Sequence, residues 1–189
     1  MKRILLLIAA IVGLLINVKA QTNVNWTDIE TAQEQIKLKA NKGKFIFVDC
    51  YTDWCGWCKV MDNKTFSDDV IAKLMNYYFI NVKFNAEQKS DVTFDNKVYR
   101  YQASGRGGAN QLAGVLLQNK LAFPSFAILN ANLSTKTVFQ GYIEKSEFEP
   151  MIVYIGEGYD TKLDYEVFKT KYLTEIRPAI IEKVSKLKK

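Results

Sequence analysis

The pentapeptide Trp54-Cys55-Gly56-Trp57-Cys58 places two thiols three residues apart. If the pair lies on the first turn of a helix, the two sulfurs can close a disulfide. The first thiol then lies beside unpaired N–H groups and the positive end of the helix dipole, and both favour the thiolate that attacks disulfides. The sequence therefore predicts that Cys55 is an exposed nucleophile. It predicts that Cys58 is shielded and resolves the mixed disulfide by a second attack.

Two other interpretations of the cysteine pair stay open. A zinc site needs four ligands, and the chain offers only Cys50 in addition and no histidine, so carboxylates would have to complete the set. A structural disulfide suits a secreted protein, but this short spacing constrains the unfolded chain little. Cys50 is predicted to be a small buried hydrophobic residue that points to the sheet face opposite Asp49. The lack of histidine also excludes Ser-His-Asp and Cys-His catalysis.

The first twenty residues have the pattern of a secretory signal peptide. Lys2 and Arg3 precede an apolar run over residues 4–16, and Val18-Lys19-Ala20 supplies small residues at the −3 and −1 positions. A membrane span takes about 20 apolar residues, which is more than this run provides. We therefore expect cleavage after Ala20 and export of the mature chain.

The charge of the mature chain argues against a nucleic-acid partner. The whole chain has 26 basic and 20 acidic residues, and the predicted signal peptide removes three of the basic ones. The remaining surplus lies in residues 159–189, which leaves residues 21–158 neutral. A neutral main body is a poor electrostatic match for nucleic acid.

Hydrophobic patterns predict the strands and helices that position the cysteines. Residues 45–51 are apolar apart from Asp49, which indicates a central strand buried on both faces. Residues 79–84 indicate a second strand, parallel to the first because a helix capped by Ser67 separates them. The other predicted elements are a helix between Thr27 and Gly43, a hairpin of strands 125–129 and 137–143, and a helix from Ser146 to about Gly156.

Two segments have weaker patterns. Residues 86–118 contain a polar stretch, a glycine-rich turn over 104–108 and a helix over 110–117. No Lys-Ser or Lys-Thr pair follows the glycines, so we interpret them as a flexible turn rather than a phosphate loop. Residues 159–189 have apolar positions at helical spacing with a break at Pro178. The predicted organisation is a signal peptide (1–20), a main domain (21–158) and a C-terminal helical extension (159–189).

Residues 47–59, with the sequence FVDCYTDWCGWCK, resemble the active-site strand and helix of the thioredoxin superfamily. Met61, Thr65-Phe66-Ser67 and Val82-Lys83-Phe84-Asn85 extend the resemblance toward the secreted bacterial branch with a WCGWCK motif. It covers about residues 26–158 and is strongest over 45–85. It implies an α/β thioredoxin fold with a central mixed β-sheet flanked by helices, an insertion near 86–118 and a C-terminal helical extension.

The resemblance also implies roles for further residues. Asp49 matches the family's buried acid, whose pKa would rise on burial and which would accept the proton of Cys58. Lys83 matches the lysine beside that acid, with a side chain that reaches solvent as the alternative. Pro124 matches the family's cis-proline opposite the cysteines. The residues expected to contact substrate are Trp54, Gly56, Trp57, Phe123 and Pro124.

The implied function is thiol–disulfide exchange in the bacterial periplasm. The expected partners are client proteins with thiols or disulfides and a membrane electron donor, with no bound cofactor and no metal. We expect a reductase or isomerase; the alternatives are an oxidase that donates its disulfide and a binding module whose cysteines only lock a loop. Trp57 stands where ordinary thioredoxins have proline, and residues between the cysteines tune the redox potential. The sequence indicates no oligomeric state.

Overall fold

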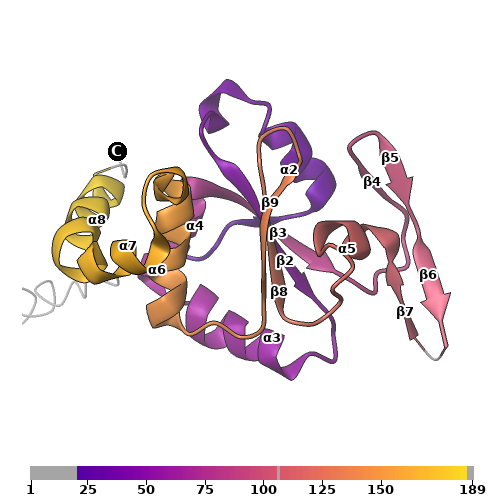
Figure 1. Cartoon of the computed structure of the whole chain (residues 1–189). Helices are drawn as coiled ribbons and strands as arrows, with labels where there is room; N and C mark the ends of the chain where they lie inside the picture. The colour runs from indigo at the N-terminus through magenta and orange to yellow at the C-terminus, as the bar shows by residue number, and fades with distance from the viewer. Residues whose placement is uncertain (1–20, 106, 187–189) are drawn as a thin grey trace, which may run out of the picture.

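The structure, a computed structural model of the chain, describes residues 21–105 and 107–186 (Figure 1). The predicted signal peptide lies outside the described residues. A five-stranded sheet in the order β1-β3-β2-β8-β9 forms the centre of the molecule. Its strands are β1 (Trp26–Thr27), β2 (Phe45–Tyr51), β3 (Phe79–Asn85), β8 (Ser125–Leu129) and β9 (Thr135–Gln140). β1, β2 and β3 are parallel to one another, β8 is antiparallel to β2, and β9 is antiparallel to β8, so the predicted mixed sheet is confirmed.

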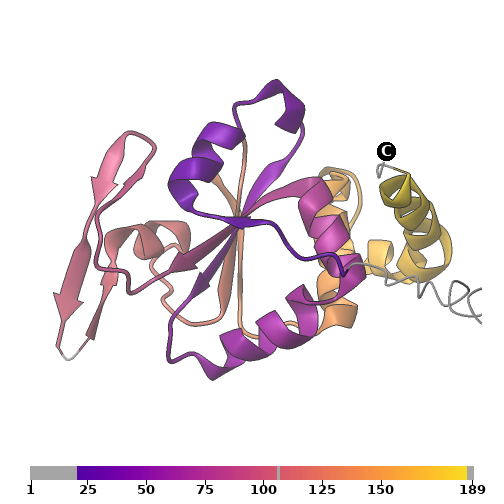
Figure 2. The same cartoon turned by 180° about the vertical axis from the view of Figure 1, so that it is seen from behind.

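Helices cover both faces of this sheet (Figures 1 and 2). They are α2 (Ile29–Gln35), α3 (Gly56–Met61), α4 (Asp69–Tyr78), α5 (Gln111–Leu116) and α6 (Lys145–Gly156). Side chains alternate along β2, so Phe47 packs with residues of α3, α4 and α6, whereas Val48 packs with α2 and α5. The two faces of β2 thus belong to two separate hydrophobic cores. This is why its sequence is almost uninterrupted in apolar residues.

Several element boundaries differ from the sequence prediction, and the largest difference is at the end of α2. Helix α2 is capped by Asp28 rather than Thr27, and α4 by Asp68 rather than Ser67. In both cases a carboxylate accepts backbone N–H bonds at the positive end of the helix dipole, where its charge is favoured. Helix α2 also ends before the predicted Gly43. A short 3₁₀ turn (Lys39–Asn41) follows the helix, and the chain reverses at Gly43 with a φ of 91° before it enters β2.

The segment 86–118 has more structure than predicted. Two hairpins precede α5, one of β4 (Val92–Phe94) with β5 (Lys97–Tyr99) and one of β6 (Tyr101–Ser104) with β7 (Gly107–Asn110). Asp95 and Asn96 have φ values of 48° and 60°, which suits the tight turn of the first hairpin. Gly108 allows close pairing in the second, because an added Cβ would lie 2.4 Å from the carbonyl oxygen of Gln102. The hairpins lie to one side of the main sheet (Figure 1).

The C-terminal extension is helical, as predicted. It comprises a 3₁₀ turn (Tyr159–Thr161), α7 (Tyr165–Lys171), a π-helical turn (Tyr172–Ile176) and α8 (Arg177–Ser185). The break precedes Pro178, which lies in the first turn of α8 where its missing N–H is not needed. Glu149 of α6 is buried; it accepts a 2.8 Å hydrogen bond from the Tyr172 hydroxyl and forms an ion pair with Arg177. These contacts attach the extension to the main domain. Within the described residues, no helix is both long and apolar enough to cross a membrane.

Candidate active site

Cys55 and Cys58 are joined by a disulfide at the N-terminus of α3. Cys55 is the N-cap residue, and its Sγ accepts the backbone N–H of Cys58 at 3.0 Å. A donor aimed at this sulfur, together with the helix dipole, stabilises negative charge on it. The predicted position of the pair on the first turn of a helix is therefore confirmed.

The predicted difference in exposure between the two cysteines is wrong for the disulfide form. Cys55 and Cys58 are each only 3% exposed. The Sγ of Cys55 is bonded to that of Cys58 and also accepts the N–H of Cys58. The neighbouring indole side chains are exposed to solvent instead: Trp54 is 68% and Trp57 60% exposed. The exposed side chains next to the disulfide in the sequence are therefore two aromatic rings.

The residues predicted to contact substrate form two groups by the contacts that they make. Trp54 lies edge-on to Phe123 with ring centroids 6.1 Å apart, and its Nε1 donates to Glu87 at 2.9 Å. The Phe123–Pro124 bond is cis. Gly56 faces open space, because an added Cβ would have no neighbour within 4 Å.

Trp57 has a different aromatic neighbour. Its ring centroid is 5.2 Å from that of Tyr142, which follows β9 in the chain. The two tryptophans thus face different neighbours: Trp54 contacts the loop that leads into β8, and Trp57 contacts the segment that leaves β9.

Asp49 and Lys83 form an ion pair next to this site. Asp49 is 1% exposed and lies directly opposite Lys83 in the β2–β3 ladder. The Nζ of Lys83 is 2.6 Å from Asp49 Oδ2, so this side chain is held by the acid rather than by solvent. Asp49 shares its sheet face with Phe47, which belongs to the same core as Met61 of α3. The acid therefore lies on the face covered by the helix that carries Cys58.

A second carboxylate, Asp62, also binds Lys83. Its Oδ1 accepts a hydrogen bond from the same Nζ, and the residue begins the π-helical turn (Asp62–Phe66) that continues α3. We had no prediction for Asp62, although its spacing of four residues from Cys58 puts both on one side of a helix. One lysine thus pairs with two acids, of which one is buried and the other half-exposed.

Burial raises the pKa of Asp49 to about 6. The charge and hydrogen bond of Lys83 oppose this rise, whereas the negative charge of Asp62 adds to it. For Lys83, burial works to lower the pKa, but the two carboxylates together raise it. Asp49 Oδ1 is buried and has no hydrogen-bond partner, so it is available to accept a proton. Near neutral pH, Asp49 is therefore suited to act as a base.

We predict that Asp62→Asn moves the acidic limb of the pH–rate profile of exchange to lower pH. The change removes the negative charge of Asp62, which raises the pKa of Asp49, and Lys83 then pairs with Asp49 only. The pKa of Asp49 should therefore fall. The expected displacement is on the order of one pH unit, the scale on which a neighbouring charge acts. Asp91→Asn is the matched control. Asp91 pairs with Arg100 in the insertion, so this substitution removes the same charge at a different place. Equal profiles for Asp62→Asn and the control would contradict the coupling.

Cys50 takes no part in this arrangement. It is fully buried in the core on the other face of β2, as predicted. Burial, reinforced by the charge of Asp49, raises the pKa of its thiol well above the ordinary value. Because it points away from the Cys55–Cys58 pair, it does not supply the third ligand that a zinc site would need. In the described part of the chain, no group of three His, Cys, Asp or Glu side chains is placed to hold a metal.

Comparison with known proteins gives a family and several relatives. The family model Thioredox_DsbH, described as "Protein of unknown function, DUF255", matches residues 11–143. Over 77 residues the chain is 36% identical to the thiol:disulfide interchange protein DsbD of Escherichia coli (strain K12), covering 39% of this chain and 14% of that protein. It is also 30% identical over 76 residues to the uncharacterized protein B0495.5 of Caenorhabditis elegans, covering 40% of this chain and 10% of that one. The chain thus spans only a small part of the curated relatives' length.

A solved structure shows the same fold. The solution structure of a thioredoxin from Thermus thermophilus superposes with a TM-score of 0.50 at 15% identity, covering 70% of this chain and 87% of that one. At this identity the likeness concerns the fold alone. Together with the mixed sheet and the helices on both faces, it confirms the predicted fold class.

Proposed function

The chain belongs to the Thioredox_DsbH family, and we propose that it is a thiol–disulfide oxidoreductase of the thioredoxin superfamily that reduces or isomerises disulfides of exported proteins. The observation that carries this proposal is the position of Cys55. It caps α3, its Sγ accepts the N–H of Cys58, and in the sequence it lies between the exposed Trp54 and Trp57. A sulfur placed in this way is activated for attack, and the exposed indoles next to it in the sequence offer a surface to a protein client.

The exchange proceeds in two displacements that balance in atoms and electrons. The Cys55 thiolate attacks one sulfur of the client disulfide; a Cys55–client disulfide forms, and the other client sulfur leaves as a thiolate that takes up a proton. Cys58 then gives its proton to Asp49 and attacks Cys55 Sγ. The Cys55–Cys58 disulfide forms and the second client sulfur leaves. Two electrons pass from the enzyme to the client.

A thiol donor must then reduce the enzyme again. We propose that this donor is a membrane protein, because an exported enzyme can receive electrons from the cytoplasm only across the membrane; the similarity to a part of DsbD, a thiol:disulfide interchange protein, supports exchange with another thiol protein. The roles of Trp54, Gly56, Trp57, Phe123 and Pro124 in this proposal are to form the surface on which the client or donor lies.

Two measurements test the direction of the reaction. The purified protein should reduce insulin with a chemical thiol as electron source, and Cys55→Ser should not. The reduction potential of the pair should lie nearer to about −270 mV, as in thioredoxin, than to about −120 mV, as in a strong oxidase. A potential at the oxidising end would favour the disulfide-donating alternative. Full insulin reduction by Cys55→Ser would remove the proposed nucleophile.

Export gives a separate prediction about the mature N-terminus. If the protein is secreted and processed, mass spectrometry of the protein from the cell envelope should give a chain that begins at Gln21. The expected change is the complete loss of residues 1–20. A mature protein that still begins at Met1 would contradict cleavage, and the proposed location in the bacterial periplasm would lose its support.

A further inference from the structure

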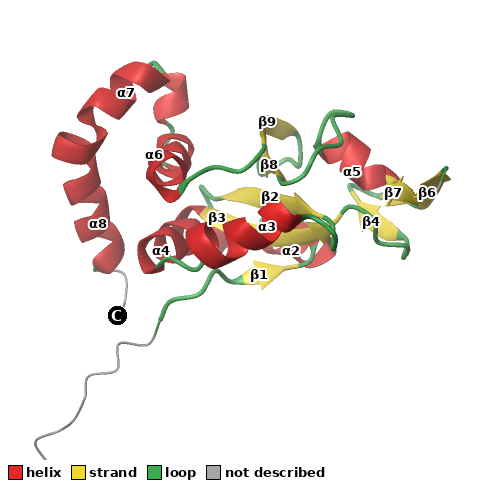
Figure 3. Ribbon diagram, turned by 90° about the horizontal axis from the view of Figure 1, so that it is seen from below, coloured by secondary structure: helices red, strands yellow, loops and turns green. Residues whose placement is uncertain are grey.

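The outer edge of β9 carries backbone groups that no other described strand pairs. β9 is the last strand of the sheet and pairs only with β8. The N–H of Gly141 donates to the carbonyl of Pro124, directly opposite, at 2.8 Å, and residue pairs in an antiparallel ladder alternate between bonded and unbonded. By this alternation, the N–H and C=O groups of Val138 and Gln140 point away from β8. Figure 3 shows no described helix or strand beyond β9 on that side.

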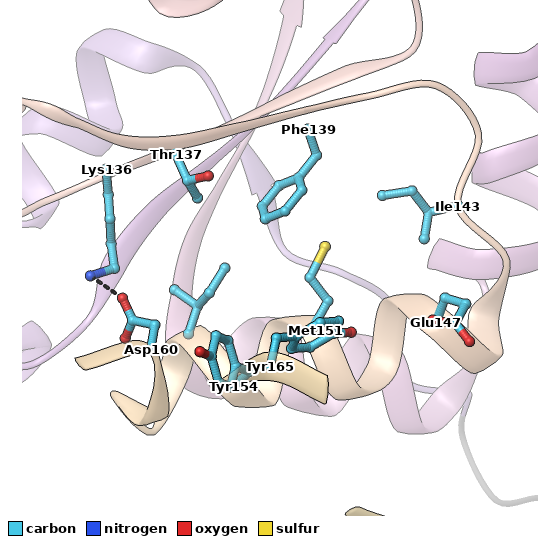
Figure 4. A pocket seen from close by; sticks show the side chains of 10 residues that line it. Lys136, Thr137, Phe139, Ile143, Glu147, Met151, Tyr154, Asp160 and Tyr165 are labelled. Carbon is cyan, nitrogen blue, oxygen red and sulfur yellow. Dashed lines mark ion pairs between the residues drawn. The ribbon is translucent and has the colours of Figure 1, made fainter. Parts of the chain in front are cut away.

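A groove lies beneath this edge, between β9 and α6 (Figure 4). It has a volume of about 570 Å³. On the strand side Thr137 and Phe139 point into it, and on the helix side Met151 points back toward Phe139. The ion pair of Lys136 and Asp160, at 2.6 Å, lies at one end. The middle of the groove is therefore apolar and suited to apolar side chains.

The edge and the groove both start at the active site. β8 begins immediately after Pro124, and Gln140 at the end of β9 is paired with the first residue of β8. The end of β9 thus lies beside the loop that faces Trp54. Tyr142, two residues further on, contacts Trp57, and Ile143 lines the groove. A polypeptide that lies along β9 therefore leads to the tryptophan between the two cysteines.

We propose that the β9 edge and this groove bind an extended segment of the client protein, next to the client cysteine that exchanges with Cys55. The inference rests on the proposed function. The segment adds a sixth strand to the sheet through backbone hydrogen bonds to Val138 and Gln140. Because side chains alternate along a strand, every second side chain of the segment points toward α6 and enters the apolar groove. The preferred client segment is therefore extended, with apolar residues at alternate positions.

The test compares Gln140→Pro with Gln140→Ala. Proline removes an outward N–H and leaves the hydrogen bonds to β8 in place, a position at which edge strands tolerate it. Alanine removes the same side chain, including its hydrogen bond to the carbonyl of Lys120, and keeps the N–H. One substrate is a glutathionylated peptide of about twelve residues with alternating leucines, long enough to reach along β9. The other is oxidised glutathione, which is too small to reach β9.

We expect Gln140→Pro to lower kcat/KM for the peptide by about fivefold, the size of one lost net hydrogen bond. Reduction of oxidised glutathione should be unchanged, and Gln140→Ala should match the wild type with both substrates. Thr137→Trp fills the groove and leaves the backbone hydrogen bonds of β9 unchanged. It should give the same selective loss with the peptide. This second variant keeps the inference testable if Gln140→Pro fails to fold. Equal kcat/KM for the peptide in all variants would overturn the inference.

Two further outcomes separate this inference from its alternatives. If the wild-type protein reduces neither substrate, the proposed function fails, and the inference fails with it. If sedimentation shows that Gln140→Pro changes the oligomeric state, the edge binds a second copy of the chain, and client docking is overturned. An unchanged oligomeric state together with the selective loss supports the client segment.

Discussion

Cys58→Ser is expected to accumulate covalent complexes with client proteins, whereas Cys55→Ser accumulates none. In Cys58→Ser the first displacement still occurs, because Cys55 keeps its place at the N-terminus of α3 and the N–H of residue 58 remains. The second displacement is lost, because no thiol remains to release the client. The complexes should appear as bands on non-reducing gels that disappear on addition of a reductant. Turnover should be abolished in both variants.

The comparison of the two serine variants contains its own control. Both remove one thiol of the pair, both prevent the Cys55–Cys58 disulfide, and both leave Cys50 buried in the opposite core. A general effect of an unpaired cysteine would therefore trap clients to the same extent in each. Equal trapping would refute the assignment of Cys55 as nucleophile and of Cys58 as resolving thiol. It would also weaken the mechanism under which Asp49 serves Cys58.

Asp49→Asn is expected to slow the resolving step at neutral pH by about 10²- to 10⁴-fold, the usual contribution of a positioned general base. The wild-type acid, with a pKa of about 6, is ionised at pH 7 and can accept the proton of Cys58. Asparagine keeps the shape and accepts no proton. The pH–rate profile of the variant should therefore lose its inflection near pH 6. Stopped-flow measurement of release from a mixed disulfide checks this, with Asp91→Asn as the control.

The same substitution should stabilise the folded protein above pH 6. The pKa of Asp49 rises from 3.8 in the unfolded chain to about 6 in the fold. Between these values the folded state holds one more proton than the unfolded state, so wild-type stability falls as the pH rises through this window. The stability cost at pH 7 is on the order of 2–3 kcal/mol. Asp62 remains as a counter-ion for Lys83 in the variant.

Chemical unfolding at two pH values separates the structural and catalytic effects of Asp49. The free energy of unfolding of Asp49→Asn should exceed that of the wild type at pH 7, and the difference should disappear below about pH 4. If Asp49→Asn is both more stable and slower than the wild type, the carboxylate of Asp49 contributes to catalysis at a cost in stability. An unchanged rate with an inflection still near pH 6 would show that Asp49 has a structural role only.

The parts of the fold that the sequence predicts best are those with long and uniform patterns. β2 is apolar over seven residues because both of its faces are buried, and the one exception, Asp49, marks the site. The short strands of the insertion span three or four residues each, too few for an alternating pattern to stand out. The caps of α2 and α4 are displaced by one residue because Thr27–Asp28 and Ser67–Asp68 each offer two side chains that can cap a helix.

The candidate site is predicted only in part, because some of its properties arise from contacts across the sequence. The cysteine motif predicts the disulfide and its place on α3. The role of Asp62 depends on its contact with Lys83, which lies 21 residues away in the sequence. In the sequence alone it is one acid among many in polar segments. The free edge of β9 depends on the order of strands in the sheet, which no local pattern contains.

The burial of Cys50 has a consequence for how the chain handles its three thiols. Disulfide reshuffling needs a thiolate that can reach another sulfur. In the native state Cys50 is sealed within the core, with a pKa raised well above its usual value, so it is neither ionised nor within reach. The fold thereby separates the reactive pair, Cys55 and Cys58, from a third thiol, Cys50, that does not react. While the protein is folded, Cys50 therefore cannot exchange with the Cys55–Cys58 disulfide. This protection against wrong disulfides ends when β2 leaves the sheet and exposes Cys50.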